Sequence, residues 1–299
     1  MTTKEMREKI ASGNGFIAAL DQSGGSTPKA LNGYGYRGDE WSSEEEMFDL
    51  IHQMRSRIIS APAFGGGKVI GAILFERTMD GTIDGKPVPQ VLAEQGVVPF
   101  IKIDKGLEDE ANGVQMMKPM PELDMLLTRA KALGVFGTKE RSVINLANPA
   151  GIAAIVAQQF EVARKVLGQG LVPIIEPEVS IKSPERAEAD GILLAEILEA
   201  LESVPASEQV MLKLSLPTEP GLFQPLVDHP KVLRVVALSG GFSREEACSQ
   251  LARNPGMIAS FSRALLSDLR HDQSDEEFNR VLGKAIDEIC EASLAEAAA

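Results

Sequence analysis

Short apolar runs recur along the chain at intervals that leave room for a helix between them. Eight of these runs have the composition of buried strands, namely Phe16–Leu20, Val69–Phe75, Val98–Ile103, Ser142–Leu146, Leu171–Ile175, Val210–Leu214, Leu233–Leu238 and Met257–Phe261. Strands that alternate with helices are typical of a parallel sheet covered by helices. We therefore predict an α/β fold, a single (β/α)8 TIM barrel spanning residues 1–299 as one domain. A doubly wound open sheet is the alternative.

The segments between these runs carry start signals of helices. Serines placed three residues before a glutamate, the spacing of a capping box, occur at Ser43, Ser243 and Ser274. Ser183 precedes Pro184, and proline is favoured at the first position of a helix. Apolar residues recur at helical spacing over Ala153–Leu167 and Asp190–Leu201. These signals support alternation of strands and helices.

Charge and composition narrow the classes of partner. The chain is 44% hydrophobic and 24% charged, which is ordinary for a globular protein. Its net charge of −13 argues against nucleic acid as the main partner, although a few local cations can still bind a small anion. The sequence shows neither a bilayer-spanning apolar run nor the apolar core of a secretion signal, so we expect a cytoplasmic protein without a membrane partner.

Cysteine and histidine usage predicts neither a disulfide framework nor a metal site. Cys248 and Cys290 form no CxxC motif and are expected to be reduced thiols. The three histidines, His52, His229 and His271, are far apart in sequence and lack the spacing of metal ligands. We therefore predict no metal and no cofactor.

In a TIM barrel the chemistry lies at the carboxyl ends of the strands, and polar residues gather there in this sequence. They are Asp21–Ser23, Lys102–Lys105, Lys139, Arg141, Glu176–Glu178, Lys213, Ser239–Gly241 and Ser262–Arg263.

Lys213 belongs to the sixth predicted strand, in which alternate side chains face opposite sides. Met211, Lys213 and Ser215 share one face, while Leu212 and Leu214 take the face toward the helices. This alternation points Lys213 into the barrel.

A lysine directed into a barrel is energetically costly unless it is neutral or paired. Burial and a neighbouring cation such as Lys139 favour the neutral amine, which can attack a carbonyl and form a Schiff base. Glu176 could then supply the proton that expels water from the carbinolamine. The alternative is a buried ion pair between Lys213 and Glu176, and the residues alone leave both interpretations open.

Two glycine-containing loops have the character of phosphate sites. Ser239–Gly241 follows a strand and precedes a helix N-terminus, so its backbone N–H groups could form an anion nest, with Arg263 as an added cation. A plain strand-to-helix turn is the alternative. A second loop contains Ser23, Gly24, Gly25 and Ser26 and is followed by Lys29, which could hold another phosphate or hydroxyl groups.

The motifs at the strand ends occur together and in a specific order. They are Ala18–Ser26, Ile73–Phe75, Ile101–Gly106, Lys139–Arg141, Val172–Glu178, Leu212–Lys213, Leu238–Gly241 and Ser262–Leu265. In this order the chain resembles class I fructose-1,6-bisphosphate aldolases in their shorter bacterial form, from about residue 16 to residue 266.

The resemblance implies a role for each matching residue. Lys213 matches the lysine that forms the Schiff base, Glu176 the acid/base of carbinolamine formation and dehydration, and Asp21 the carboxylate that takes the C4 hydroxyl proton. Lys139 matches the cation beside the imine. Substrate-binding roles are implied for Arg141, Lys102 and Glu178 in the site, for Ser239, Gly240 and Arg263 at the C1 phosphate, and for Ser23, Ser26 and Lys29 toward the other phosphate.

The sequence departs from the animal enzymes of this family in three places. Ala30 replaces the arginine that binds the C6 phosphate, so we expect that phosphate to be held differently or more weakly. Leu214-Ser215 follows the nucleophile in place of Pro-Asn. The chain ends in alanines, without the C-terminal tyrosine that exchanges the enamine proton in animals.

The activity implied by the resemblance is reversible cleavage of fructose 1,6-bisphosphate to dihydroxyacetone phosphate and glyceraldehyde 3-phosphate, in glycolysis or gluconeogenesis. A Schiff-base aldolase for another phosphorylated sugar and a non-catalytic sugar-phosphate-binding barrel are the alternatives. The expected partners are a small-molecule sugar phosphate and further copies of this chain, because homo-oligomers are common among soluble proteins.

Overall fold

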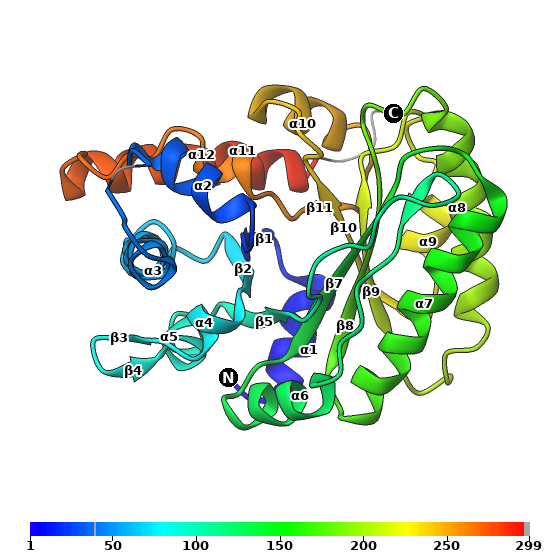
Figure 1. The fold of residues 1–299 in the computed structure, drawn as a ribbon, viewed down its shortest axis with the longest axis horizontal. Coiled ribbons are helices and arrows are strands. Elements are labelled where there is room, and N and C mark those ends of the chain that lie inside the picture. The colour runs from blue at the N-terminus through cyan, green and yellow to red at the C-terminus, as the bar shows by residue number, and fades with distance from the viewer. Residues whose placement is uncertain (39, 296–299) are drawn as a thin grey trace.

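The computed structural model describes residues 1–38 and 40–295 as a nearly closed barrel of parallel strands with helices around it (Figure 1). The strands follow the order β1-β2-β5-β7-β8-β9-β10-β11, and each pairs in parallel with the next. Their bounds are β1 Phe16–Leu20, β2 Val69–Leu74, β5 Val98–Lys102, β7 Gly137–Ile144, β8 Val172–Val179, β9 Val210–Ser215, β10 Val232–Leu238 and β11 Ile258–Ala259. The predicted TIM barrel is confirmed, and the open-sheet alternative is wrong.

The barrel closes between its last and first strands. The N–H of Ala19 donates to the carbonyl of Phe261 at 3.1 Å, just beyond the end of β11. Three short strands lie outside this ring: β6, Val114–Gln115, pairs antiparallel with β7, and β3 and β4, Thr82–Ile83 and Lys86–Pro87, form a separate hairpin.

Three of the predicted strands differ from the structure by more than one residue at an end. β7 begins at Gly137 and not at Ser142, and β8 continues past the predicted end at Ile175 to Val179. Residues 137–141 and 176–179 include charged side chains. A search for apolar runs alone therefore does not predict them as strand. β11 is limited to Ile258–Ala259 because only these two residues pair with β10.

The helices lie on the outer side of the sheet and at one end of it (Figure 1). Their bounds are α1 Thr3–Ser12, α2 Ser26–Tyr34, α3 Glu44–Ser60, α4 Glu76–Met79, α5 Val88–Glu94, α6 Leu123–Ala132, α7 Pro149–Gly168, α8 Arg186–Leu201, α9 Gln224–Val227, α10 Arg244–Leu251, α11 Arg263–Leu266 and α12 Asp275–Ser293. The predicted serine caps are confirmed, and Ser243 with Glu246 forms the reciprocal capping box. The predicted start at Pro184 is wrong, because the N–H of Ser183 closes a turn onto Ser180 and α8 begins at Arg186.

Two apolar clusters lie on opposite faces of the sheet. The outer cluster joins strands to helices and contains Leu212 and Leu214, while the inner cluster contains Met211 and fills the lower part of the barrel. The predicted alternation of β9 is therefore confirmed, and Lys213 points into the barrel at a level above the inner cluster.

Helix α1 covers the barrel at the amino-terminal ends of the strands. It contacts β2, β5 and β10, and its buried residues Met6 and Ile10 belong to the inner cluster with Ile17 and Ile70. The opposite end, where the strands finish, is thereby left for a cavity. In the described part of the chain, no helix is long and apolar enough to cross a bilayer.

The alanine-rich tail predicted at the end of the chain lies partly at residues 296–299, outside the described residues.

Candidate active site

A cavity of about 770 Å³ opens at the carboxyl ends of the strands. Its lining includes the four residues expected to act in catalysis, Asp21, Lys139, Glu176 and Lys213. It also includes nine of the residues expected to bind substrate, Ser23, Ser26, Lys29, Lys102, Arg141, Glu178, Ser239, Gly240 and Arg263. Gly241 is the predicted residue that does not line the cavity, because it is exposed beyond the rim of the loop.

Four buried side chains, three on strands β7, β8 and β9 and one directly after β1, form a continuous chain of ion pairs at the floor of this cavity. Nζ of Lys213 lies 3.1 Å from Oε1 of Glu176, and Oε2 of Glu176 lies 3.0 Å from Nζ of Lys139. The same lysine Nζ lies 2.7 Å from Oδ2 of Asp21. The ion pair between Lys213 and Glu176 is thus present, and it places a carboxylate beside the amine.

Asp21, Glu176 and Lys139 hold one another in the ionised state. Burial alone raises the pKa of Asp21, but the ammonium groups of Lys139 and Lys213 outweigh burial and lower this pKa well below its ordinary range. The same balance lowers the pKa of Glu176. Burial lowers the pKa of Lys139, and Asp21 and Glu176 together raise it above its ordinary value. Lys139 is therefore a fixed cation between two carboxylates.

Two further ion pairs flank the floor. Nζ of Lys102 lies 2.6 Å from Oδ1 of Asp104 and also donates to the Asp104 carbonyl at 2.9 Å. Nε of Arg141 lies 2.6 Å from Oε2 of Glu178. These pairs give the cavity walls both donors and acceptors, as recognition of sugar hydroxyl groups requires.

The loops after β10 and β11 meet at one side of the cavity. Gly240 has a φ of 60°, and a Cβ at this position would lie 2.6 Å from Cγ2 of Ile181, so only glycine fits without displacement. A Cβ on Gly241 would lie 3.4 Å from Nη2 of Arg263, which places the guanidinium beside the loop. The glycine loop and the cation predicted for a phosphate thus lie side by side.

The loop after β1 forms another side of the cavity. Ser26 Oγ accepts from the N–H of Ser23 at 2.9 Å and donates to the Ser23 carbonyl at 2.8 Å. Lys29 and Ala30 lie on the first turns of α2, and both line the cavity. The exposed side chain of Lys29 and the methyl group of Ala30 therefore face the region where the family resemblance predicts the second phosphate.

Sequence reasoning missed several residues of the cavity. Gln22, Asp104 and Ser262 line it and bond to other site residues, but each was considered only as part of a longer motif. Ser260 was missed because it falls inside an apolar run, although its buried hydroxyl finds no hydrogen-bond partner among the described residues. Alternation could have identified it, because Ile258 on the same face belongs to the inner cluster.

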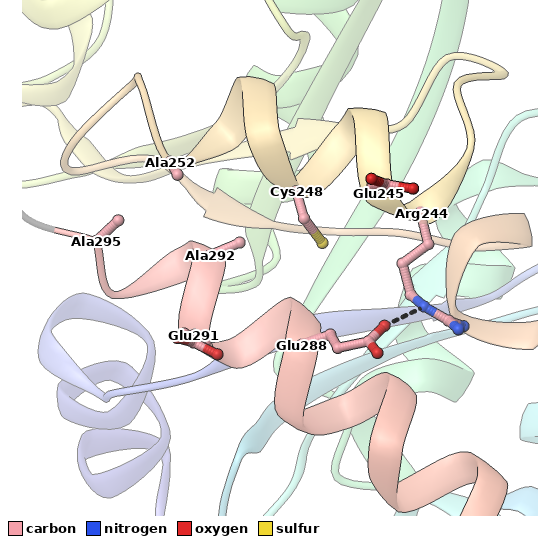
Figure 2. A pocket seen from close by; sticks show the side chains of 8 residues that line it. All are labelled: Arg244, Glu245, Cys248, Ala252, Glu288, Glu291, Ala292 and Ala295. Atoms are coloured by element: carbon pink, nitrogen blue, oxygen red, sulfur yellow. Dashed lines mark hydrogen bonds and ion pairs between the residues drawn. The ribbon is translucent and has the colours of Figure 1, made fainter.

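A second cavity, of about 630 Å³, lies between α10 and α12 (Figure 2). Arg244 donates to Glu288 there at 2.6 Å. Cys248 points from α10 toward α12 in Figure 2, and burial raises the pKa of this thiol to about 11. Every residue of the predicted site lies elsewhere, so the chemistry predicted from the sequence belongs to the cavity of the barrel.

Comparison with known proteins agrees with this geometry. A family model described as "Fructose-bisphosphate aldolase class-I" matches residues 3–218. Among solved structures, the chain is similar to a fructose-bisphosphate aldolase from Plasmodium falciparum, determined in complex with TRAP and a small-molecule inhibitor. That similarity has a TM-score of 0.82 and 21% sequence identity, and it covers 99% of this chain and 96% of the other.

Proposed function

Because the chain belongs to the class-I fructose-bisphosphate aldolase family, which cleaves fructose 1,6-bisphosphate to two triose phosphates, we propose that Lys213 is its Schiff-base nucleophile. The observation that carries this assignment is the position of the Lys213 amine, buried at the floor of the cavity and 3.1 Å from Glu176. A lysine held beside a carboxylate has a proton acceptor at hand, as a nucleophilic amine requires.

Imine formation uses the carboxylate between the two lysines. Lys213 passes one proton to Glu176, its neutral amine attacks C2 of the sugar, and Glu176 returns that proton to the oxygen that was the carbonyl. A second proton then passes from the carbinolamine nitrogen through Glu176 to the hydroxyl group, which leaves as water and gives the protonated imine. Lys139, 3.0 Å from Glu176, stabilises the carboxylate before and after each of these transfers. General acid–base help of this kind is typically worth ~10²–10⁴-fold in rate.

Cleavage follows from the charge on the imine. The protonated imine draws the electron pair of the C3–C4 bond as that bond breaks, so the product bound to Lys213 is a neutral enamine. Asp21 takes the proton of the C4 hydroxyl, and glyceraldehyde 3-phosphate leaves. The lowered pKa of Asp21 keeps it ionised at neutral pH. Protonation of the enamine and hydrolysis of the imine then release dihydroxyacetone phosphate.

We assign the two phosphates to the two loops at the rim. Ser239, Gly240 and Arg263 would hold the C1 phosphate, since all three line the cavity and the guanidinium lies beside the glycine loop. Ser23, Ser26 and Lys29 would hold the C6 phosphate. Ala30 offers no donor beyond its backbone, so Lys29 is the cation of that loop.

The remaining walls would bind the sugar hydroxyl groups. Lys102 with Asp104, and Arg141 with Glu178, line the cavity as ion pairs that expose both donors and acceptors. Strands from residue 16 to residue 259 contribute to the one ring, which supports a single catalytic domain. The cytoplasm and a homo-oligomeric state remain part of this proposal.

Steady-state kinetics on three substrates test the assignment. We expect kcat/KM for fructose 1,6-bisphosphate to exceed the value for fructose 1-phosphate, because both phosphate loops then contact substrate. It should also exceed the value for sedoheptulose 1,7-bisphosphate, whose second phosphate lies one carbon farther along the chain. A higher value for either competitor would favour an aldolase for another phosphorylated sugar. Sugar-phosphate binding without cleavage would favour the non-catalytic alternative.

A further inference from the structure

Arg55 is a fully buried arginine outside the cavity, on the face of α3 that packs against the sheet. Its Nη1 donates to Thr78 Oγ1 at 2.7 Å, and its Nη2 donates to the backbone carbonyl of Gln22 and, at 3.4 Å, to Gln22 Oε1. Within the described part of the chain it forms no ion pair with a carboxylate. Its hydrogen bonds within the described chain go to neutral oxygens, and burial lowers the pKa of its guanidinium while the charge of Asp21 opposes that effect, so its buried position calls for an explanation.

Gln22 connects Arg55 to the opposite side of the edge at which the barrel closes. Its Nε2 donates to Oγ of Ser262 and also, at 3.3 Å, to the carbonyl of Ala19. Gln22 follows β1, whereas Ser262 follows β11, and these two strands are joined in the backbone by the bond from Ala19 to Phe261. Figure 1 shows β1 and β11 beside each other at this edge.

The neighbours of this contact are the residues to which catalysis is assigned. Asp21 immediately precedes Gln22, and Arg263 immediately follows Ser262. Arg55 therefore fixes the backbone that carries the catalytic carboxylate, and Gln22 links that backbone to the loop of the phosphate cation. By contrast, Lys139 and Glu176 lie inside β7 and β8, which pair with each other over their full lengths, and Lys213 lies inside β9, which pairs with β10, whereas Asp21 lies one residue beyond the end of β1.

We propose that Arg55, Gln22 and Ser262 form a seam clamp, a set of positioning residues that holds Asp21 in place for carbon–carbon cleavage. The clamp acts after imine formation, because Glu176 and Lys213, which form the imine, lie inside paired strands, whereas Asp21 lies beyond the end of β1 and next to Gln22. This inference rests on the proposed roles of Asp21 and Lys213. It predicts a defect in cleavage that is separate from imine formation.

The two halves of the reaction can be measured apart. Cleavage of fructose 1,6-bisphosphate gives kcat and KM, and borohydride reduction with saturating dihydroxyacetone phosphate gives the yield of imine on Lys213. For Gln22→Ala we expect kcat of cleavage to fall about 10- to 100-fold, the range that a small misplacement of a catalytic group produces, with the trapped yield unchanged. Arg55→Met should give the same defect, and Arg55→Lys should recover part of it, because one ammonium can still donate to the Gln22 carbonyl.

A double-variant cycle tests whether Gln22 acts through Ser262. If the two side chains work through their mutual bond, Gln22→Ala combined with Ser262→Ala lowers kcat no further than the more damaging single change. An unchanged kcat in Gln22→Ala, a parallel loss of cleavage and trapping, or fully additive effects would each overturn the clamp. The Gln22 and Ser262 variants decide the question even if Arg55→Met fails to fold. Wild-type protein that neither cleaves nor traps would instead refute the proposed function, and the clamp with it.

Discussion

Lys139 makes two of the three contacts in the buried ion-pair chain, one to Asp21 and one to Glu176. Burial opposes the ionisation of Asp21 and Glu176, and Lys139 is the largest of the influences that favour it. The charged state of the site at neutral pH thus depends on one lysine that forms no bond to substrate in the proposed mechanism.

Lys139→Met should destabilise the fold by about 3–5 kcal/mol near neutral pH, because it leaves two buried carboxylates with one cation fewer. In the wild type the folded pKa of Asp21 and of Glu176 lies below the ordinary values of 3.8 and 4.5. Their stabilising contribution is therefore present above these values and is lost as the pH falls through the folded pKa. Removing Lys139 raises the folded pKa of both carboxyls. The difference in unfolding free energy between wild type and Lys139→Met should therefore become smaller below about pH 4.5.

Urea unfolding of wild type and Lys139→Met from pH 4 to pH 8 measures this effect. Lys165→Met is the matched control, because Lys165 forms an exposed ion pair with Glu161 on α7 and should matter little. A difference between wild type and Lys139→Met that is independent of pH would contradict the account.

Glu140 is a further buried carboxyl, on the outer face of β7 between Lys139 and Arg141. Neither of its oxygens has a hydrogen-bond partner in the described chain. Burial, with repulsion from Asp104, raises its pKa well above the ordinary value, and Lys139 only partly opposes this. Glu140 is therefore neutral in the folded protein at a pH where the unfolded chain ionises it.

Glu140→Gln should become progressively more stable than the wild type as the pH rises. A group with a raised folded pKa contributes fully below its unfolded pKa, here 4.5, and loses that contribution as the pH rises toward the folded pKa. Each pKa unit of this shift corresponds to about 1.4 kcal/mol. Thermal unfolding of wild type and Glu140→Gln at pH 5 and pH 8 measures this effect. A difference in Tm between the two proteins that is the same at both pH values would contradict a neutral Glu140.

At the scale of elements, the loop after β10 depends on the loop after β8. Gly240 adopts a φ of 60°, and Ile181 fills the space that a Cβ would need. The backbone at the proposed C1-phosphate site is thus positioned by a side chain from a different βα unit.

Gly240→Ala should raise KM for fructose 1,6-bisphosphate, because strain at positive φ costs roughly 1–2 kcal/mol and Cγ2 of Ile181 would lie 2.6 Å from the new Cβ. That free energy corresponds to about a tenfold change in affinity. Adding Ile181→Ala removes the collision but not the strain, so KM should recover only in part. Gly191→Ala in α8 is the control, since nothing lies within 4 Å of its Cβ. An unchanged KM in Gly240→Ala would show that the loop does not bind the phosphate.

The elements also show what sequence can and cannot predict. The alternation of side chains along β9 correctly predicts that Lys213 points into the barrel. Met211, on the same face as Lys213, belongs to the inner cluster, whereas Leu212 belongs to the outer cluster. The start of β7 was missed because Lys139 and Arg141 are stabilised by carboxylates from other strands, which a local apolar pattern does not reveal. The roles of the site residues came from the resemblance, and the contact between Gln22 and Ser262, 240 positions apart, required the structure.

For the whole molecule, the inner apolar cluster and the proposed chemistry lie at opposite ends of the barrel. Helix α1 packs Met6 and Ile10 into the inner cluster at the amino-terminal ends of the strands. The ion-pair chain and the cavity lie at the carboxyl ends. Changes at the lower end should therefore affect folding much more than turnover.

Ile10→Ala should lower the free energy of unfolding by about 2–5 kcal/mol, because it removes a fully buried side chain from a packed cluster. The kcat and KM of the folded protein should stay close to those of the wild type. Met125→Ala, at a position that is 63% exposed, is the control and should change stability by less than about 0.5 kcal/mol. A large fall in kcat with unchanged stability in Ile10→Ala would contradict this division.

The central claim is that Lys213 carries the substrate as an imine. Reduction with sodium borohydride in the presence of dihydroxyacetone phosphate, followed by mass analysis of the intact chain and its peptides, tests it most directly. We predict one adduct on the peptide that contains Lys213, dependent on substrate and absent in Lys213→Met, which should also lose cleavage. Cleavage that persists in Lys213→Met, or an adduct on a different lysine of the cavity, would contradict the claim.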